Sequence, residues 1–230
     1  MLFTQLIKGS MKVATDIPGL DKLMDGGFEE GSINLISGKT GTGKSVFCLQ
    51  FLFNGVTSFG EKGLYVTTEE TEAYLKKQAL QFGWDFSELE KKGLVKIVAF
   101  EPFDIDTLTT KITEQVNLTG AKRVAIDSVS MFELYISEAY RIRKSIFKFL
   151  QKLKEMDITS IVTAEIPEDS NALSRFGVIE FLVDAVIVLQ YMTIAKYKRS
   201  LMIRKMRTSK HSMNIHPFEI TSDGIHVMDV

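Results

Sequence analysis

The stretch Gly38-Lys39-Thr40-Gly41-Thr42-Gly43-Lys44-Ser45 decides the fold of this chain. It fits the spacing G-x-x-x-x-G-K-[ST], which is typical of a loop that cradles nucleotide phosphates. The preceding residues 32–37 have the pattern of a short buried strand, and residues 46–53 are almost wholly apolar, which favours a buried helix. Strand, glycine loop and helix follow one another in the order that such a loop requires. A glycine-rich turn that matches by chance is therefore the weaker interpretation.

The residue types in this loop explain how it would hold a triphosphate. Glycines let successive backbone N–H groups turn inward and form a nest for an anion, and the following helix directs its positive dipole end to the same place. Lys44 can reach the β- and γ-phosphates, and the Ser45 hydroxyl can bind Mg²⁺. The expected ATP-binding residues of the loop are Thr40, Gly41, Thr42, Gly43, Lys44, Ser45 and Val46.

Composition limits what kind of protein this is. The chain has 230 residues, of which 45% are hydrophobic and 25% charged, so we expect one domain over residues 1–230, with residues 1–11 as an N-terminal arm. The net charge of −1 provides no basic field for non-specific binding to nucleic acid. The only cysteine, Cys48, permits neither a disulfide framework nor a zinc site, and no apolar run is as long as a membrane span. These features favour a cytoplasmic protein that does not bind membranes.

Acidic residues follow two of the expected strands. Residues 63–68 lead into Glu69 and Glu70, where a carboxylate could deprotonate a water that attacks the γ-phosphate. An equally good interpretation is that these acids only open the next helix, whose dipole they complement. Residues 122–126 lead into Asp127, the position of an acid that helps to hold the metal in nucleotide-hydrolysing enzymes with this loop.

Alternating strands and helices predict an α/β fold with a mostly parallel central sheet flanked by helices. The basic side of the helix expected over residues 141–156 could contact nucleic acid, although a solvated face is the commoner explanation. After Tyr191 no long helix is expected, and short strands predict C-terminal β-hairpins. The remaining expected strands are 94–100, 158–164, 184–190, 201–207, 217–220 and 224–227, and the remaining expected helices are 71–82 and 106–118.

Several stretches together resemble the KaiC family, within the RecA-like ATPases, from about Lys12 to the C-terminus. The resemblance implies a RecA-like P-loop NTPase core and a homologue of the single-domain kind that is common in archaea. The stretches that carry it are Gly26-Gly27, the loop 38–45, Thr67-Thr68-Glu69-Glu70-Thr71, Phe82-Gly83-Trp84-Asp85, Ile126-Asp127-Ser128 and Lys205-Met206-Arg207 with His211.

The resemblance also implies roles for single residues. Glu69 matches the family's general base and Glu70 its neighbour, Lys44 and Ser45 match the contacts to phosphate and Mg²⁺, and Asp127 matches the acid of the metal strand. Lys205, Arg207 and His211 match residues that reach the ATP of the adjacent subunit in a ring, which implies a hexamer. Strand alternation places Lys205 and Arg207 on one side of their strand, and their own chain's sequence offers no obvious partner for them.

One departure from the family bears on activity. The family's autokinase domain carries a Ser-Thr pair just before its counterpart of residues 184–189, whereas residues 179–183 of this chain contain no hydroxyl. We therefore expect no autophosphorylation there. The sequence also ends at Val230 without the long regulatory tail of the circadian protein, so a clock role is not expected.

Three functions remain for comparison. The first is a Mg²⁺-dependent ATPase that forms a ring and acts as a molecular switch. The second is a signalling or motor-accessory module that binds ATP with little turnover and acts on an unidentified protein partner. The third is a recombinase-like DNA-dependent ATPase, against which the low net charge counts.

Overall fold

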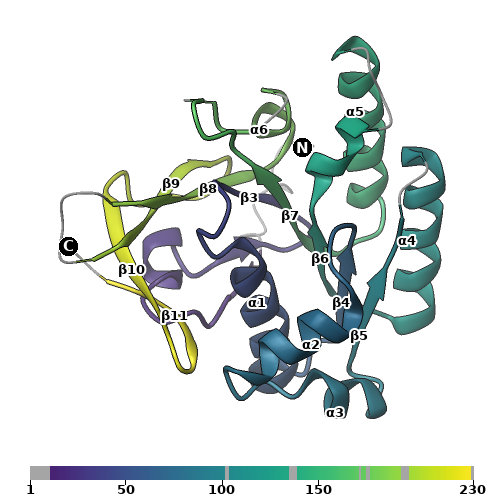
Figure 1. Ribbon diagram of the computed structural model, residues 1–230, viewed down its shortest axis with the longest axis horizontal. Helices are drawn as coiled ribbons and strands as arrows, with labels where there is room; N and C mark the ends of the chain where they lie inside the picture. The colour runs from purple at the N-terminus through teal and green to yellow at the C-terminus, as the bar shows by residue number, and fades with distance from the viewer. Residues whose placement is uncertain are drawn as a thin grey trace, which may run out of the picture.

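A computed structural model describes residues 11–101, 104–134, 139–170, 172–174, 177–192 and 197–228. Its main feature is a nine-stranded sheet with the order β11-β10-β9-β8-β3-β7-β6-β4-β5 (Figure 1). The strands from β8 to β5 in this order are all parallel to their neighbours. They are β3 (Ile33–Gly38), β4 (Gly63–Thr67), β5 (Val95–Ala99), β6 (Arg123–Asp127), β7 (Thr159–Glu165) and β8 (Ala185–Tyr191).

The C-terminal strands extend this sheet in the antiparallel sense. They are β9 (Arg199–Met206), β10 (Ile215–Thr221) and β11 (Gly224–Val227). β9 pairs with β8, β10 with β9, and β11 with β10. The expected α/β fold, with a mostly parallel sheet and C-terminal hairpin strands, is therefore confirmed.

Helices cover both faces of the sheet, and each face has its own hydrophobic core. One core contains Phe47, Leu75 and Trp84 from the side of α1 (Lys44–Phe59), α2 (Glu72–Leu80) and α3 (Phe86–Lys91). The other contains Ile112 and Ile146, from α4 (Ile105–Thr119) and α5 (Ala139–Lys154). Short helical turns complete the described elements, namely η1 (Asp21–Met24), η2 (Val129–Leu134) and α6 (Ile179–Leu182).

Local sequence explains where several helices begin and end. Asp104 accepts a hydrogen bond from the Thr107 amide at the start of α4, and Gly120 ends that helix in the left-handed conformation. In α5 the apolar side chains other than Phe147 and Tyr140 face the core, while the basic side chains Arg143, Lys144 and Lys148 are exposed. None of the described helices has the length and apolar character needed to cross a membrane.

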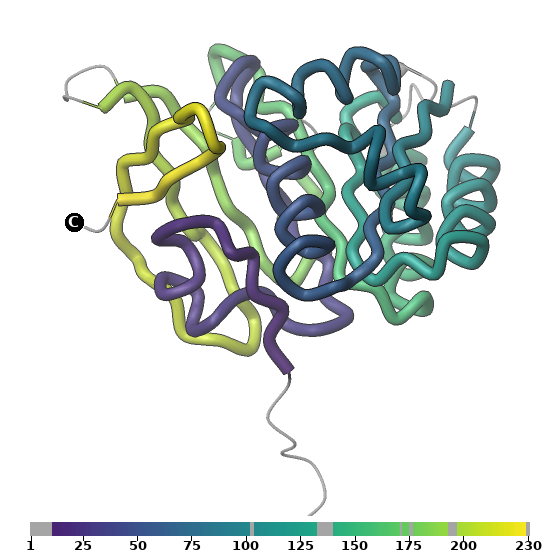
Figure 2. The backbone as a smooth tube through the Cα atoms, turned by 90° about the horizontal axis from the view of Figure 1, so that it is seen from below, coloured from purple at the N-terminus to yellow at the C-terminus, as the bar shows by residue number. Residues whose placement is uncertain are grey.

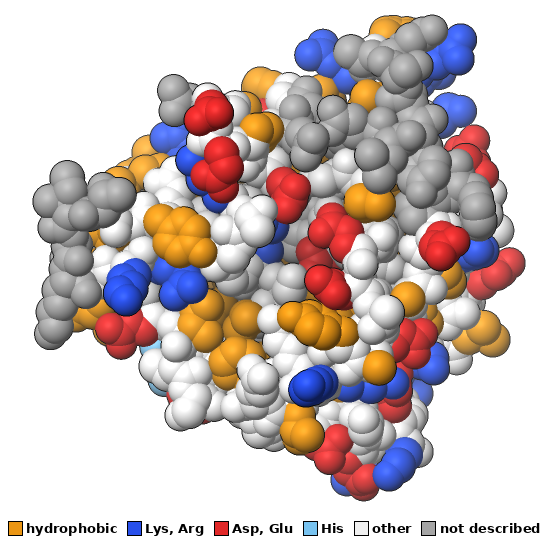
Figure 3. All heavy atoms as spheres, in the orientation of Figure 1, with side chains coloured by type: hydrophobic (Ala, Val, Ile, Leu, Met, Phe, Trp, Pro, Cys, Tyr) orange, Lys and Arg blue, Asp and Glu red, His pale blue; other side chains and the backbone are white. Residues whose placement is uncertain are grey.

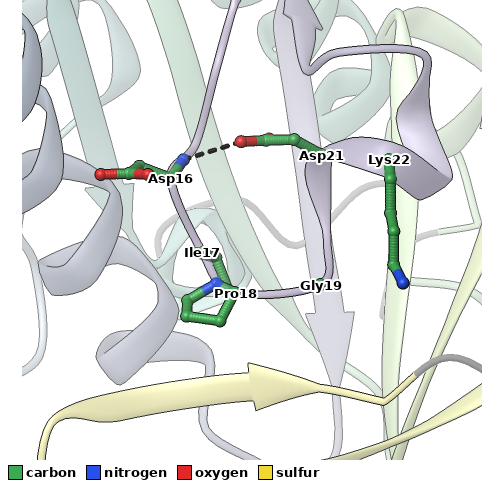
Figure 4. A pocket seen from close by; sticks show the side chains of 6 residues that line it. All are labelled: Asp16, Ile17, Pro18, Gly19, Asp21 and Lys22. Atoms are coloured by element: carbon green, nitrogen blue, oxygen red, sulfur yellow. Dashed lines mark hydrogen bonds between the residues drawn. The ribbon is translucent and has the colours of Figure 1, made fainter.

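The N-terminal segment lies beside the last strand. β1 (Lys12–Val13) pairs with β2 (Phe28–Glu29), and between them the Asp21 carboxylate accepts from the backbone amide of Asp16 (Figure 4). The Val227 amide in β11 donates to the Pro18 carbonyl at 2.8 Å. A side-chain carbon at Gly19 would lie 1.9 Å from the Val227 carbonyl oxygen, so this approach requires glycine. Segments from the two ends of the chain thus close one side of the molecule (Figure 2).

Candidate active site

The loop that opens α1 has the geometry of an anion nest. Gly41 and Gly43 have φ values of 74° and 112°, a region that favours glycine, and Gly43 caps α1 without a side-chain hydrogen bond. No side chain of the described residues therefore caps the amides at the helix start, and they can bind an anion there. The Lys44 ammonium donates to the carbonyls of Gly38 at 2.9 Å and Lys39 at 3.0 Å, so it lies inside the curve of the loop.

The remaining loop residues contact the loop backbone, the strand β10 and the core beneath α1. The Thr42 hydroxyl donates to the Lys39 carbonyl at 2.8 Å. A side-chain carbon at Gly43 would lie 3.0 Å from Ile220 of β10, and the Val46 side chain is buried in the core beneath α1. The C-terminal hairpin therefore supports the loop from the side, a contact that no local sequence signal predicted.

Asp127 is held at the end of β6 by three hydroxyl groups from three different elements. Its Oδ2 accepts from Ser45 and from Tyr65, both at 2.6 Å, and its Oδ1 accepts from Thr163 at 2.5 Å. Burial raises the pKa of the Tyr65 hydroxyl well above its usual value, with the charge of Asp127 adding to the rise, so this hydroxyl remains a donor. The expected pair of Ser45 and Asp127 is thus brought into direct contact.

The oxygens of Ser45 and Asp127 fit Mg²⁺, which prefers hard oxygen ligands and keeps several waters or phosphate oxygens. Among the described residues no group of three or more His, Cys, Asp or Glu side chains could hold a metal ion. A Mg²⁺ ion at this place would therefore depend on oxygens from the nucleotide as well.

The structure distinguishes the two adjacent glutamates. The Glu69 carboxylate accepts a hydrogen bond from the Ser128 hydroxyl, whereas the Glu70 side chain makes no hydrogen bond or ion pair with any described residue. Partial burial raises the pKa of Glu69, and the negative charges of Asp127 and Glu165 raise it further, against the Ser128 hydrogen bond. Both residues are exposed, and the Ser128 hydrogen bond holds the Glu69 side chain beside the segment that carries Asp127.

Glu165 is a site residue that the sequence prediction missed. It is the last residue of β7, and its Oε1 accepts from the Thr40 hydroxyl at 3.3 Å. Burial lowers the pKa of Lys44, and the charge of Glu165 opposes this more than that of any other residue. The strand-end rule that indicated Asp127 could have found Glu165, but the expected strand stopped one residue earlier. Figure 3, which has the orientation of Figure 1, shows several acidic side chains near the centre of the face that is turned to the viewer.

The structure does not bring Lys205 and Arg207 to the loop of their own chain. The loop follows Gly38, which lies opposite Leu189 near the carboxyl end of β8, whereas the Arg207 amide donates to the Asp184 carbonyl just before β8 begins. Five residues of strand separate these places, roughly 16 Å at the usual rise per residue. His211, in the segment after β9, has a buried Nε2 atom without a hydrogen-bond partner among the described residues.

The expectation that these basic side chains lack a partner in their own chain is wrong. The Lys205 ammonium donates to the carbonyls of Glu180 and Val183 at 2.9 and 2.7 Å, and Arg207 donates to the Phe181 carbonyl at 2.8 Å. The reason is that these carbonyls belong to the C-terminal end of α6, where backbone oxygens attract cations. Backbone carbonyls are present at every residue, so a search of the sequence for acidic side chains could not identify these partners.

Comparisons with known proteins agree with this geometry. A protein-family model described as "ATPase: KaiC" matches residues 13–230. The chain belongs to the KaiC ATPase family. The circadian clock oscillator protein KaiC of Parathermosynechococcus lividus is 34% identical over 96% of the chain, which spans only 43% of that relative. The UPF0273 protein MJ1359 of Methanocaldococcus jannaschii is 36% identical, over 94% of this chain and 96% of its own length.

A solved structure supports the same family fold. The KaiC-like protein PH0186 from Pyrococcus horikoshii matches with a TM-score of 0.88 and 40% identity, covering 96% of this chain and 100% of that one. The fold is therefore the KaiC/RecA-like fold, and family membership implies ATP binding. The single-domain expectation for residues 1–230 stays a prediction.

Proposed function

We propose that this protein is a Mg²⁺-dependent ATPase that works as a ring of identical subunits, in the manner of a molecular switch. The observation that carries the proposal is the separation of two charged groups in one chain. The loop, Asp127 and Glu69 lie together at the carboxyl edge of the parallel strands, whereas Arg207 lies near the amino end of β8. A ring in which Arg207 of one subunit reaches the loop of the next would bring the two groups together.

Each residue of the loop region has a defined task in this proposal. The amides of the loop and of the first turn of α1 bind the phosphates, and Lys44 neutralises charge on the β- and γ-phosphates. Ser45 and Asp127 would hold Mg²⁺, which when bound would supply positive charge next to the phosphates. Tyr65 and Thr163 keep the Asp127 carboxylate in place by hydrogen bonds to its two oxygens.

Glu69 is the proposed general base. Its carboxylate is held by Ser128 on the side of the site where Lys44 and Asp127 exert their charges on it. A raised pKa makes a carboxylate a better proton acceptor for the attacking water. Lys205, Arg207 and His211 would come from the neighbouring subunit, with Arg207 supplying positive charge to the γ-phosphate.

The matched pair Glu69→Gln and Glu70→Gln tests the assignment. Phosphate release and ATP binding would be measured on the same size-exclusion fractions, with light scattering to determine subunit number. We expect Glu69→Gln to lower the release rate by roughly 10²- to 10⁴-fold with nearly unchanged ATP binding. Glu70→Gln should stay within a few-fold of the unmodified protein, because the Glu70 side chain makes no hydrogen bond or ion pair with the part of the chain that the structure describes. An unchanged rate in Glu69→Gln would remove its role as base.

The state of the unmodified protein decides between the ring and a binding module. An assembly that is stabilised by Mg²⁺ and ATP and releases phosphate supports the proposal. A monomer that binds ATP without releasing phosphate would instead favour a nucleotide-dependent module that acts on a protein partner.

A further inference from the structure

Glu165 stands at the point where β7 meets the phosphate loop. In the parallel pairing of β3 and β7 it lies opposite Gly38, the first residue of the loop. Its carboxylate accepts a hydrogen bond from the Thr40 hydroxyl at 3.3 Å, and the next amide, that of Ile166, donates to the Gly38 carbonyl at 3.2 Å. Both its backbone neighbour and its side chain are therefore bound to the loop.

The backbone of Glu165 is also fixed from the opposite side. Its amide donates to the Ser130 hydroxyl at 2.8 Å, and the Ser130 amide donates to the Ser128 hydroxyl at 3.2 Å. Ser128 is the residue that holds Glu69. Glu165 thus sits between the loop and the segment that positions the proposed base, so its charge acts at a fixed place.

Several carboxylates lie near Lys44 at this place. Lys44 is affected by three carboxylates, of which Glu165 has the largest influence, followed by Asp127 and Glu69. Ser45, Tyr65 and Thr163 donate to Asp127, and Ser128 donates to Glu69. Glu165 contacts the tip of the loop itself, where the terminal phosphate of a triphosphate would lie.

We propose that Glu165 is a specificity-determining residue that weakens the binding of a nucleoside triphosphate relative to the diphosphate. The inference rests on the proposed ATPase function and deepens it. The Glu165 carboxylate repels the additional charge of the γ-phosphate, and it competes for the Thr40 hydroxyl, which otherwise could donate to a phosphate oxygen. A diphosphate lacks the group that is repelled and is affected much less.

This arrangement has a consequence for the reaction cycle. Repulsion of the bound γ-phosphate raises the free energy of the state before hydrolysis relative to the state after it. Thr40 would then exchange partners during each cycle, from Glu165 to the phosphate and back again. The hydrogen bond between Thr40 and Glu165 would form again when the γ-phosphate leaves.

The test measures the affinities for Mg²⁺-ATP and Mg²⁺-ADP by competition against a fluorescent ADP analogue. The variant Glu165→Gln has nearly the same shape and can still accept from Thr40, but it carries no charge. We expect its ATP affinity to rise roughly fivefold to tenfold, with ADP affinity changed by less than about twofold. The ratio of the two affinities is the readout, because a general loss of folding lowers both.

Two further variants separate charge from shape. Glu165→Asp keeps the charge, so its ratio of ATP to ADP affinity should stay close to that of the unmodified protein. Glu168→Gln removes the same charge from an exposed side chain that pairs with Lys39 at 3.2 Å, and solvent should screen its effect. Thermal unfolding without nucleotide confirms that each variant is folded.

The outcomes distinguish this inference from the function on which it rests. An unchanged ratio in Glu165→Gln, or an equal shift in Glu165→Asp or Glu168→Gln, would overturn the inference while leaving ATP binding intact. Failure of the unmodified protein to bind either nucleotide would overturn the proposed function and the inference together.

Discussion

At the carboxyl edge of the parallel strands, acidic side chains are held by hydroxyl groups, whereas near the amino end of β8 Lys205 and Arg207 are held by backbone carbonyls. Hydroxyl groups donate to Asp127 and to Glu69, and Lys44 donates to carbonyls of its own loop. Lys205 and Arg207 instead donate to the end of α6. Because a carbonyl is a weaker partner for a cation than an anion is, Lys205 and Arg207 can exchange these carbonyls for an anionic group.

The largest expected effect concerns Arg207. Replacing it with alanine should lower ATP hydrolysis by roughly 10³-fold, because a positive charge at the γ-phosphate is lost from the neighbouring subunit. ATP binding to the loop should fall far less, since the loop's own contacts remain. Phosphate release under saturating ATP measures the effect.

Arg204 provides the control for this variant. It lies on the same strand as Lys205 and is exposed to solvent, with only a Met202 sulfur contact among the described residues. Arg204→Ala should keep nearly full hydrolysis. Equal losses in both variants would mean that general positive charge on β9 matters rather than the position of Arg207.

The second effect is on the free energy of unfolding, and it tests whether Arg123 fixes α1, the helix that follows the loop, to the sheet. Arg123 is buried and pairs with Glu61, and its guanidinium lies 4.7 Å from the ring centroid of Phe51 in the middle of α1 and 5.0 Å from that of Phe59 at its end. Replacing it with methionine should lower the free energy of unfolding by about 3 kcal/mol, because Glu61 loses its partner and the stacking is lost. Chemical denaturation measures this.

The adjacent residue supplies a matched comparison. Lys122 pairs with Asp157 at 3.6 Å, but both side chains are exposed, so Lys122→Met should cost less than about 1 kcal/mol. A similar cost for Arg123→Met and Lys122→Met would contradict the view that Arg123 fixes α1 to the sheet.

The third effect is a pH dependence of hydrolysis. Because the pKa of Glu69 is raised above the usual value of 4.5, the base becomes protonated at a higher pH than an ordinary glutamate would. Activity should be full above the raised pKa and fall by about tenfold for each pH unit below it. The acidic limb of the rate profile should be absent in the residual activity of Glu69→Gln. A limb that persists there would assign it to another group.

The smallest effect concerns the segment that follows Arg207. The Ser209 hydroxyl donates to Glu29 at 2.6 Å and so ties this segment to β2. Ser209→Ala should lower the free energy of unfolding by about 1 kcal/mol and leave nucleotide binding to the loop unchanged. Ser222→Ala, on the turn between β10 and β11, should change neither quantity. Loss of nucleotide binding in Ser209→Ala would show that the phosphate loop depends on the segment after Arg207 of the same chain.

Burial opposes the ionisation of Glu29, but the hydrogen bonds from Lys12, Ser209 and Thr208 outweigh it and lower its pKa. The contribution of this anchor to stability is therefore present above the pKa of an unfolded glutamate and is lost as the pH falls through the lowered value. Denaturation curves at acidic pH should show a smaller difference between Ser209→Ala and the unmodified protein.

The sequence predicted those parts of the fold and site that depend on local spacing. The loop 38–45 and the acid at the end of β6 were predicted because glycines and strand-end carboxylates have fixed places in such folds. The contact of Tyr65 with Asp127 was missed, since it arises from the pairing of β4 with β6. The end of α1 was also missed, because polar Asn54 interrupts the apolar run while its side chain donates to Thr15 and Asp16 carbonyls.

Mixing two inactive variants tests the central claim most directly. Subunits carrying Glu69→Gln and subunits carrying Arg207→Ala would be combined in equal amounts, allowed to exchange, and assayed for phosphate release. If Arg207 acts on the neighbour's loop, sites that combine an intact Glu69 with an intact Arg207 from the other variant should restore about a quarter of the full rate. If the mixture stays as inactive as its components, Arg207 does not act across subunits and the account is contradicted.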